Sequence, residues 1–302
     1  MDKLALVQIS VTINSGREML GNSGESADHF TCALSIDLES WVHRQIGFTI
    51  DSNTKRALDN GYIKRAISNI LSLLKKYDRR ITFFVVSEIF SWYPEVAFDI
   101  KAGGHEIAYH THTHRYVKTK QDLVDELRLS ESFLEKFGPV GFRAPEATMT
   151  KECLKVLKEY GFEYDSSTYG TLDSSNMING IREIPISTFS FFNSKSELTL
   201  PRNITRQLLS TELPLGSGFF MSALGPAARF LPNLLSFHNK IPVLFIHPWQ
   251  ILTHDTLSLS QENGLFKRVA LSLYSHDCSE AFIYLVSHFN TIQMKDLAGK
   301  LN

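Results

Sequence analysis

The stretch that decides the fold reads GHEIAYHTHTH and covers residues 104–114. Its first half, Glu106–Tyr109, has the length of one strand and is apolar after its first residue, and its second half carries His110, His112 and His114. Continuous apolar runs of strand length are typical of parallel strands that are covered on both faces. We therefore predict a buried strand over 106–109 whose carboxyl end carries imidazole groups.

Comparable runs recur along the chain and alternate with amphipathic segments. Further strands are expected at 31–37, 81–86, 140–142, 162–165, 182–185 and 243–247. Helices are expected between them, at 61–77, 88–101, 120–137 and 151–160. Roughly seven or eight such strand–helix units favour an α/β barrel with a parallel sheet.

The chain contains no linker-like stretch rich in Gly, Pro or Ser that would divide this pattern. We therefore expect residues 29–302 to form a single barrel domain. Residues 1–28 lack the alternation and are expected to form an N-terminal arm or a peripheral strand. The interval 190–217 is expected to pass over the mouth of the barrel.

Composition excludes several classes of protein. The 302 residues include 31 basic and 32 acidic side chains, so we expect no binding to a nucleic acid backbone. Cys32, Cys153 and Cys278 stand far apart, which excludes a disulfide scaffold and a thiolate zinc site. The apolar runs fall far short of the roughly 20 residues that span a bilayer, and no export signal is recognisable. The expectation is a cytoplasmic enzyme whose association with membranes is at most peripheral.

Polar side chains follow several of the predicted strands. They are Asp37, Glu39, His110, His114, Arg143, Asp165 and His247. In α/β barrels the side chains at the carboxyl ends of the strands converge on one rim, where active sites are built. We therefore expect these residues to meet in one site.

The histidines and the DLE tripeptide at 37–39 point to a metal ion. His110 and His114 can share one ion if their segment forms a helical turn, whereas an extended segment places His112 on the same face as both. Asp37 and Glu39 point to the same side of a strand, so one can bind metal while the other serves as a base. Two histidines and one carboxylate leave positions open for water and substrate.

Other residues at the strand ends have more than one interpretation. Arg143 stands just before the rigid Pro145, and we expect it to orient a carboxylate through two parallel hydrogen bonds. His247 fits either a catalytic group or a buried, hydrogen-bonded imidazole. Trp249 fits either core packing or a face for a sugar ring, and Asp165 begins a sequence that is common in turns.

Five motifs in this order resemble the NodB-homology polysaccharide deacetylases, and are most similar to the subgroup found with exopolysaccharide and O-antigen assembly. They are DLE at 37–39, HTHTH at 110–114, FRAP at 142–145, YDSS at 164–167 and FIHPW at 245–249. The resemblance implies a distorted (β/α)7 barrel that removes N-acetyl groups from the amino sugars of a polysaccharide or its precursor. It also implies a divalent metal, zinc above all, with cobalt or nickel as alternatives.

The resemblance assigns roles to the first two motifs. Asp37 matches the catalytic base of the family, and His110 and His114 match its two metal-binding histidines. The usual pattern has a metal-binding aspartate directly after the base, where this chain has Leu38. Glu39 fits the variant in which the metal carboxylate lies one residue further on.

The later motifs supply the remaining roles. Arg143 matches the arginine that holds the base, His247 the general acid, and Asp165 lies near the acidic residue that tunes that histidine. Glu146 replaces the usual aromatic residue, so only its backbone N–H is expected to serve in an oxyanion hole. The candidates for stacking on the sugar are Trp41 and Trp249.

The residues leave other functions open. A hydrolase of a small non-peptide amide on the same barrel would use the same groups, and Leu38 is compatible with a catalytically silent glycan-binding relative. A non-haem iron oxygenase also uses two histidines and a carboxylate, but normally on an antiparallel scaffold. The expected partner is an N-acetylated glycan, and the sequence leaves its identity and the oligomeric state open.

Overall fold

The computed structural model describes residues 30–45, 50–191, 198–202, 209, 211–253, 273–274 and 276–301. The expected N-terminal arm, residues 1–28, lies outside the described residues, as does much of the interval 190–217. Among the helices that the structure does describe, none has the length and apolarity that crossing a membrane requires.

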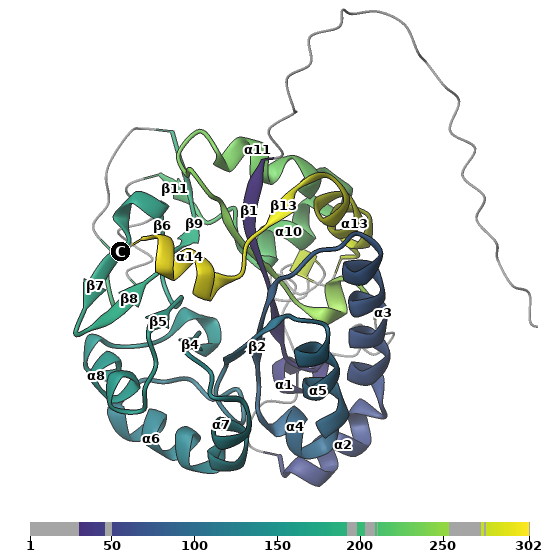
Figure 1. The fold of residues 1–302 in the computed structure, drawn as a ribbon, viewed down its shortest axis with the longest axis vertical. Helices are drawn as coiled ribbons and strands as arrows, with labels where there is room; N and C mark the ends of the chain where they lie inside the picture. Colours follow the sequence, from purple (N-terminus) through teal and green to yellow (C-terminus); the bar gives the residue numbers. More distant parts are fainter. Residues whose placement is uncertain are drawn as a thin grey trace, which may run out of the picture.

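The described strands build a curled sheet whose strands are parallel to their neighbours, except for the antiparallel β7–β8 pair (Figure 1). In hydrogen-bonded order they are β12 (Val243–Ile246), β1 (Thr31–Leu38), β2 (Thr82–Val85), β3 (Glu106–Tyr109), β4 (Gly141–Phe142), β5 (Tyr164–Asp165), β8 (Ile181–Glu183) and β7 (Asn176–Ile178). A further strand, β13 (Asn290–Thr291), pairs with the beginning of β1. The expected α/β fold of the distorted-barrel type is confirmed.

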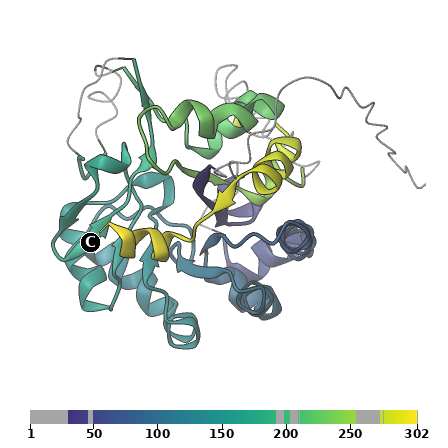
Figure 2. The same ribbon diagram turned by 45° about the horizontal axis from the view of Figure 1, so that its top comes forward.

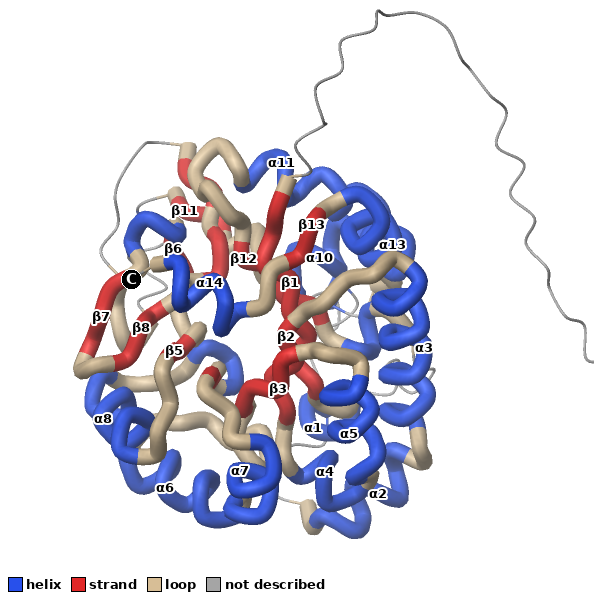
Figure 3. Tube along the Cα trace, viewed as in Figure 1, coloured by secondary structure: helices blue, strands red, loops and turns tan. Residues whose placement is uncertain are grey.

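Helices surround this sheet on the outside (Figures 1 and 2). Those that follow the first strands are α1 (Trp41–Gln45), α2 (Ser52–Asp59), α3 (Tyr62–Lys76), α4 (Glu88–Trp92), α5 (Pro94–Ala102), α6 (Lys120–Leu129), α7 (Glu131–Phe137) and α8 (Lys151–Glu159). The later ones are α10 (Gly218–Leu224), α11 (Leu231–Leu235), α13 (Ser279–His288) and α14 (Met294–Lys300). Figure 3 shows β1, β2, β3 and β12 in the middle of the molecule and β7 at its edge, with helices along the other sides. Helix α3 illustrates the packing, because its Ile63, Ile67 and Ile70 lie on one face and are buried.

Two helices that the sequence predicts as single segments are each divided. The predicted helix 88–101 breaks into α4 and α5 at Tyr93, since Pro94 disfavours a helical conformation in the residue before it. The predicted helix 120–137 breaks at Ser130, whose hydroxyl donates a hydrogen bond to the carbonyl oxygen of Glu126 at 2.8 Å. A serine that bonds back in this way bends a helix.

The open side of the sheet is bridged at Gly216 rather than by a full strand. Gly216 N donates to Ser187 O of β9 (Ile186–Ser187), and Gly216 O accepts from Phe245 N of β12. A Cβ atom at this position would lie 2.4 Å from Val243 O, so the close approach requires glycine. The barrel is therefore distorted at this side, between β9 and β12.

Candidate active site

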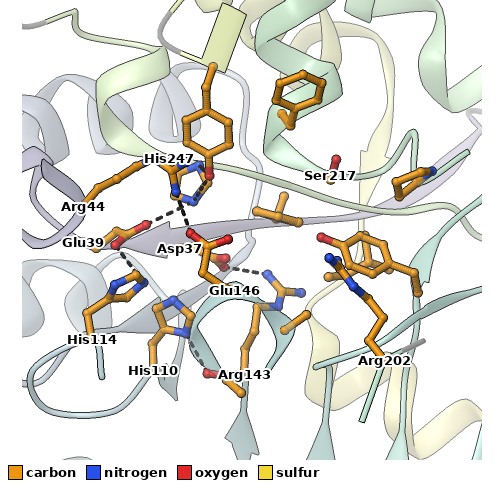
Figure 4. A pocket seen from close by; sticks show the side chains of 18 of the residues that line it. Asp37, Glu39, Arg44, His110, His114, Arg143, Glu146, Arg202, Ser217 and His247 are labelled. Atoms are coloured by element: carbon orange, nitrogen blue, oxygen red, sulfur yellow. Dashed lines mark hydrogen bonds and ion pairs between the residues drawn. The ribbon is translucent and has the colours of Figure 1, made fainter. Parts of the chain in front are cut away.

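A pocket of about 280 Å³ lies at the carboxyl ends of the strands. The strand-end side chains that line it are Asp37, Glu39, His110, His114, Arg143 and His247 (Figure 4). They come from β1 and from the segments directly after β1, β3, β4 and β12. The convergence expected for the ends of parallel strands is therefore present.

Glu39, His110 and His114 form the centre of a candidate metal site. One nitrogen or oxygen atom from each lies within 4.8 Å of the others, and all three side chains are buried. His110 Nδ1 lies 2.6 Å from the carbonyl oxygen of Arg143 and donates to it, which leaves Nε2 free to bind a cation. Glu39 Oε2 lies 2.8 Å from His114 Nε2 but is not aligned for a hydrogen bond with any described residue.

The electrostatics of His110 and Glu39 also fit a divalent cation, whereas the Glu39 carboxylate outweighs burial and raises the pKa of His114, which must lose its proton to bind the cation. Burial lowers the pKa of His110 to about 4, so its ring is neutral at neutral pH, as a metal ligand must be. Burial opposes the ionisation of Glu39, but His114 and His247 outweigh it and hold the pKa of this carboxyl well below its ordinary value. One carboxylate and two imidazoles are a donor set that suits zinc and similar ions.

The HTHTH segment is neither a helical turn nor a continuation of the strand. Strand β3 ends at Tyr109, and Thr111 and His114 adopt left-handed backbone conformations, with φ of 62° and 64°. These turns point His112 elsewhere, and its Nδ1 lies 2.8 Å from Ser87 Oγ. The alternative of three histidines around one ion is therefore wrong, and His110 and His114 are the pair that faces Glu39.

Glu126 of α6 holds this segment in place, although the sequence analysis did not identify it. Its buried carboxylate accepts the backbone N–H groups of His112 and Thr113 at 2.8 and 2.7 Å and the hydroxyl of Thr113 at 2.8 Å. Hydrogen bonds to a charged acceptor are among the stronger ones in proteins. Nothing in the sequence near Glu126 distinguishes it from the other acidic residues of its helix.

Arg143 holds Asp37 as expected, but through one nitrogen instead of two. Its Nη1 lies 2.6 Å from Asp37 Oδ1 and also donates to Ser35 Oγ at 2.9 Å. The remaining donors bind the carbonyl and hydroxyl oxygens of Ser166, at 3.0 and 2.9 Å. The expected bidentate contact is therefore absent from the described contacts, because the other edge of the guanidinium is engaged by Ser166.

His247 is fixed by Gln250, a second residue that the sequence analysis did not identify. Gln250 Oε1 accepts from the ring Nδ1 of His247 at 3.1 Å and from its backbone N–H at 2.9 Å. This arrangement turns Nε2 toward the pocket, where it lies 3.2 Å from Glu39 Oε1 and 3.1 Å from the Tyr274 hydroxyl. The signal for Gln250 is its place as the third residue after His247, where it completes a capping box.

Asp165 does not lie beside His247. It is fully buried outside the pocket lining, and its Oδ1 accepts the hydroxyl of Ser167 at 2.6 Å. Its direct partner in the neighbouring strand is Glu183, and the two carboxyl groups interact. Burial, and then the charge of Asp165, raises the pKa of Glu183 well above its ordinary value. The described contacts thus make Asp165 part of a buried carboxyl pair behind the site.

Neither candidate sugar-stacking tryptophan lines the pocket. Trp249 is fully buried and stacks on the ring of His247, with 4.4 Å between the ring centroids, and Trp41 is only 5% exposed. A buried indole offers no face to a sugar, so Trp249 supports the imidazole instead. The aromatic residues that do line the pocket are Tyr169, Phe219, Phe220, Phe245 and Tyr274.

Glu146 lies on the pocket wall in a short turn with a left-handed backbone conformation, φ 53°. Strained conformations of this kind are frequent at functional sites. Its carboxylate accepts a hydrogen bond from Arg44 Nη1 at 2.6 Å, and the Arg44 guanidinium lies 3.9 Å from the centre of the Tyr274 ring. The side chain of Glu146 is thus engaged with Arg44, and its backbone N–H remains the candidate oxyanion donor.

Comparison with known proteins points to one family. Residues 47–164 match the family model for polysaccharide deacetylases. The chain is 30% identical over 186 residues to a peptidoglycan deacetylase-like protein of Gibberella zeae, which covers 56% of this chain and 52% of that protein. It is 28% identical over 109 residues to a peptidoglycan-N-acetylglucosamine deacetylase of Bacillus cereus, which covers 35% of this chain and 51% of that enzyme. The aligned regions therefore span about half the length of both curated relatives.

A solved structure supports the same fold. The crystal structure of a probable polysaccharide deacetylase from Pseudomonas aeruginosa aligns with 89% of both chains at 16% identity and a TM-score of 0.50. At this identity the likeness concerns the fold alone. The family-model match and the two sequence relatives thus show that part of this chain is similar to polysaccharide deacetylases, and the solved structure shows a similar fold.

Proposed function

We propose that this protein hydrolyses the N-acetyl groups of amino sugars, in a polysaccharide or its biosynthetic precursor, with the help of a divalent cation. The observation that carries the proposal is that two carboxylates at the end of β1, Glu39 and Asp37, lie in one pocket and have different partners. Glu39 belongs to a cluster that fits a cation, whereas Asp37 is not a member of that cluster and pairs with Arg143. Hydrolysis by metal-activated water needs a ligand set and a free base side by side.

The chemical problem is the attack of water on an amide that is stable at neutral pH. A cation held by Glu39, His110 and His114 would polarise the acetyl carbonyl and lower the pKa of a bound water toward about 7. Asp37 would accept the proton of the attacking water through the carboxylate that Arg143 fixes at 2.6 Å. The pocket therefore holds a base that does not have to serve as a ligand.

Glu146 and His247 would act after water has attacked the acetyl carbonyl. The backbone N–H of Glu146 would donate to the oxyanion that develops on the acetyl oxygen, a contact worth roughly 3 kcal/mol in comparable sites. His247 would donate the proton on Nε2 to the departing amine nitrogen, which is otherwise a very poor leaving group. Gln250 keeps that nitrogen directed into the pocket because it engages Nδ1.

The proposal is tested by acetate release from N-acetylhexosamine oligomers, measured together with the cation content of each variant. We expect Asp37→Asn to keep the cation and to lose turnover by orders of magnitude, because it removes the base alone. We expect His110→Ala to lose both. Full turnover by a folded Asp37→Asn variant would contradict the proposal. Loss of the cation from Asp37→Asn but not from Glu39→Gln would show that the two carboxylates have exchanged roles.

Three finer points remain predictions of the sequence. They are zinc as the metal, exopolysaccharide or O-antigen assembly as the setting, and a cytoplasmic location. The metal is testable by comparing zinc, cobalt and nickel in the apoprotein. The setting is testable by comparing lipid-linked, nucleotide-linked and polymeric substrates.

A further inference from the structure

We propose that the substrate carries an anionic group close to its acetamido sugar and that Arg202 binds this group. The inference deepens the proposed function and rests on it, because it concerns the substrate class of the same pocket. The evidence is the balance of charges on the pocket wall and the way in which Arg202 is held there.

Three arginine side chains line the pocket, and two of them have carboxylate partners. Arg143 binds Asp37, and Arg44 binds Glu146, each at 2.6 Å. Arg202 forms an ion pair with none of the carboxylates that the structure describes. It is therefore the one pocket arginine whose charge the described part of the chain leaves available to a ligand.

The backbone near Arg202 is anchored to the barrel. The side chains of Leu198 and Leu200 are buried, and the carbonyl oxygen of Thr199 accepts the hydroxyl of Thr168 at 3.3 Å. These contacts place the residues before Arg202 against β6 (Tyr169–Gly170) and the turn that precedes it. Arg202 thus reaches the pocket from a segment that the rest of the protein holds.

An aromatic ring orients the guanidinium group. The central carbon of the guanidinium lies 4.7 Å from the centre of the Tyr169 ring, which also lines the pocket. Stacking of this kind occupies one face of the guanidinium and leaves its N–H edges free. Those edges match the paired oxygens of a carboxylate or phosphate.

The position of Arg202 fixes where the anion would lie on the substrate. Figure 4 shows Arg202 on the side of the pocket away from His110 and His114, with Asp37 between them. A substrate whose acetamido group faces Asp37 would extend along the pocket toward Arg202. The group at that end would be the carboxylate of an acidic sugar or a phosphate ester, which share the planar pairing of two oxygens with two N–H groups.

The test compares three substrates with the same N-acetylhexosamine core: a neutral one, one with a carboxylate and one with a phosphate ester. The quantity measured is the ratio of kcat/KM for each anionic substrate to that for the neutral substrate. We expect the protein to favour one of the anionic substrates and Arg202→Gln to reduce that ratio by about 10- to 100-fold, since a hydrogen bond to a charged group is lost. Arg202→Lys should restore part of it, because it keeps the charge without the planar edge. The preferred anion identifies the source of the charge.

The matched control is Arg229→Gln. Arg229 also stacks on an aromatic ring, with 4.7 Å to the centre of Phe230, but it is exposed and lies outside the pocket lining. We expect this variant to keep the substrate ratio of the parent. A similar fall in both variants would overturn the specific role of Arg202.

Binding measurements separate this inference from the proposed function. Calorimetry of the same three glycans with Asp37→Asn, with and without Arg202→Gln, does not depend on turnover. Tighter binding of an anionic glycan that requires Arg202, without acetate release by the parent, would support anion recognition and contradict the deacetylase. Acetate release from all three substrates with a ratio that Arg202→Gln leaves unchanged would overturn the inference and leave the deacetylase standing.

Discussion

Replacement of Arg143 by Met removes the guanidinium charge that faces the buried carboxylate of Asp37. Arg143 and Asp37 are almost fully buried, with side chains 2% and 5% exposed, so solvent does little to screen the charge that remains. Loss of one partner of a buried ion pair costs about 3–5 kcal/mol. For a chain of this size that loss corresponds to a fall of roughly 10 °C in the melting temperature. The variant keeps the backbone carbonyl that accepts from His110, so its cation content should not change.

The assay is calorimetric unfolding of a double-mutant cycle with Asp37→Asn. Because the cost arises from an unpaired charge, the double variant should be more stable than Arg143→Met alone. Turnover should be lost in all three variants. A melting temperature of Arg143→Met equal to that of the parent, or a double variant that loses the sum of the two single effects, would refute the reasoning.

Three further predictions concern residues behind the site. Glu126→Gln should weaken cation affinity by about 10-fold, measured by competition with a chelator, because the loop that carries His114 loses its charged acceptor. Gln250→Leu should lower kcat by about 10- to 100-fold and leave the content of bound metal unchanged, because His247 loses the hydrogen-bond partner of its Nδ1. This loss is smaller than the full contribution of a general acid, since the imidazole itself remains. The raised pKa of Glu183 gives stability that is complete below its ordinary pKa and is lost as pH rises toward the folded value. The melting temperature of Glu183→Gln should therefore fall less between pH 5 and 8 than that of the parent. An equal fall in both proteins would contradict a raised pKa of Glu183.

The residues that the sequence placed at strand ends could be predicted because their positions follow from local pattern. An apolar run such as Val243–Ile246 has few stable arrangements other than a buried strand, and parallel strands bring their carboxyl ends to one edge. Asp37, Glu39 and His247 come directly from or after such runs, and all three line the pocket. The same reasoning gave the fold without any information about contacts.

The residues that support the site could not be predicted in the same way. Glu126 supports the HTHTH segment from helix α6, and Arg202 lines the pocket from a segment far along the chain. Both roles depend on tertiary contacts that no local pattern records. Asp165 ends a strand as predicted, but its partner across to the neighbouring strand is Glu183, and this pairing is likewise a tertiary contact that no local pattern records. Tryptophan is a residue type that often stacks on sugar rings, which made Trp249 a candidate. Its ring packs against His247 instead, and this contact could not be predicted from the sequence.

The central claim is that Glu39, His110 and His114 hold one cation beside a free Asp37. The most direct test is equilibrium dialysis of zinc against the purified protein and its His110→Ala/His114→Ala variant, with circular dichroism to show that both are folded. The account predicts one tightly bound zinc ion per chain in the parent and none in the folded variant. Equal, stoichiometric binding by both proteins would contradict it.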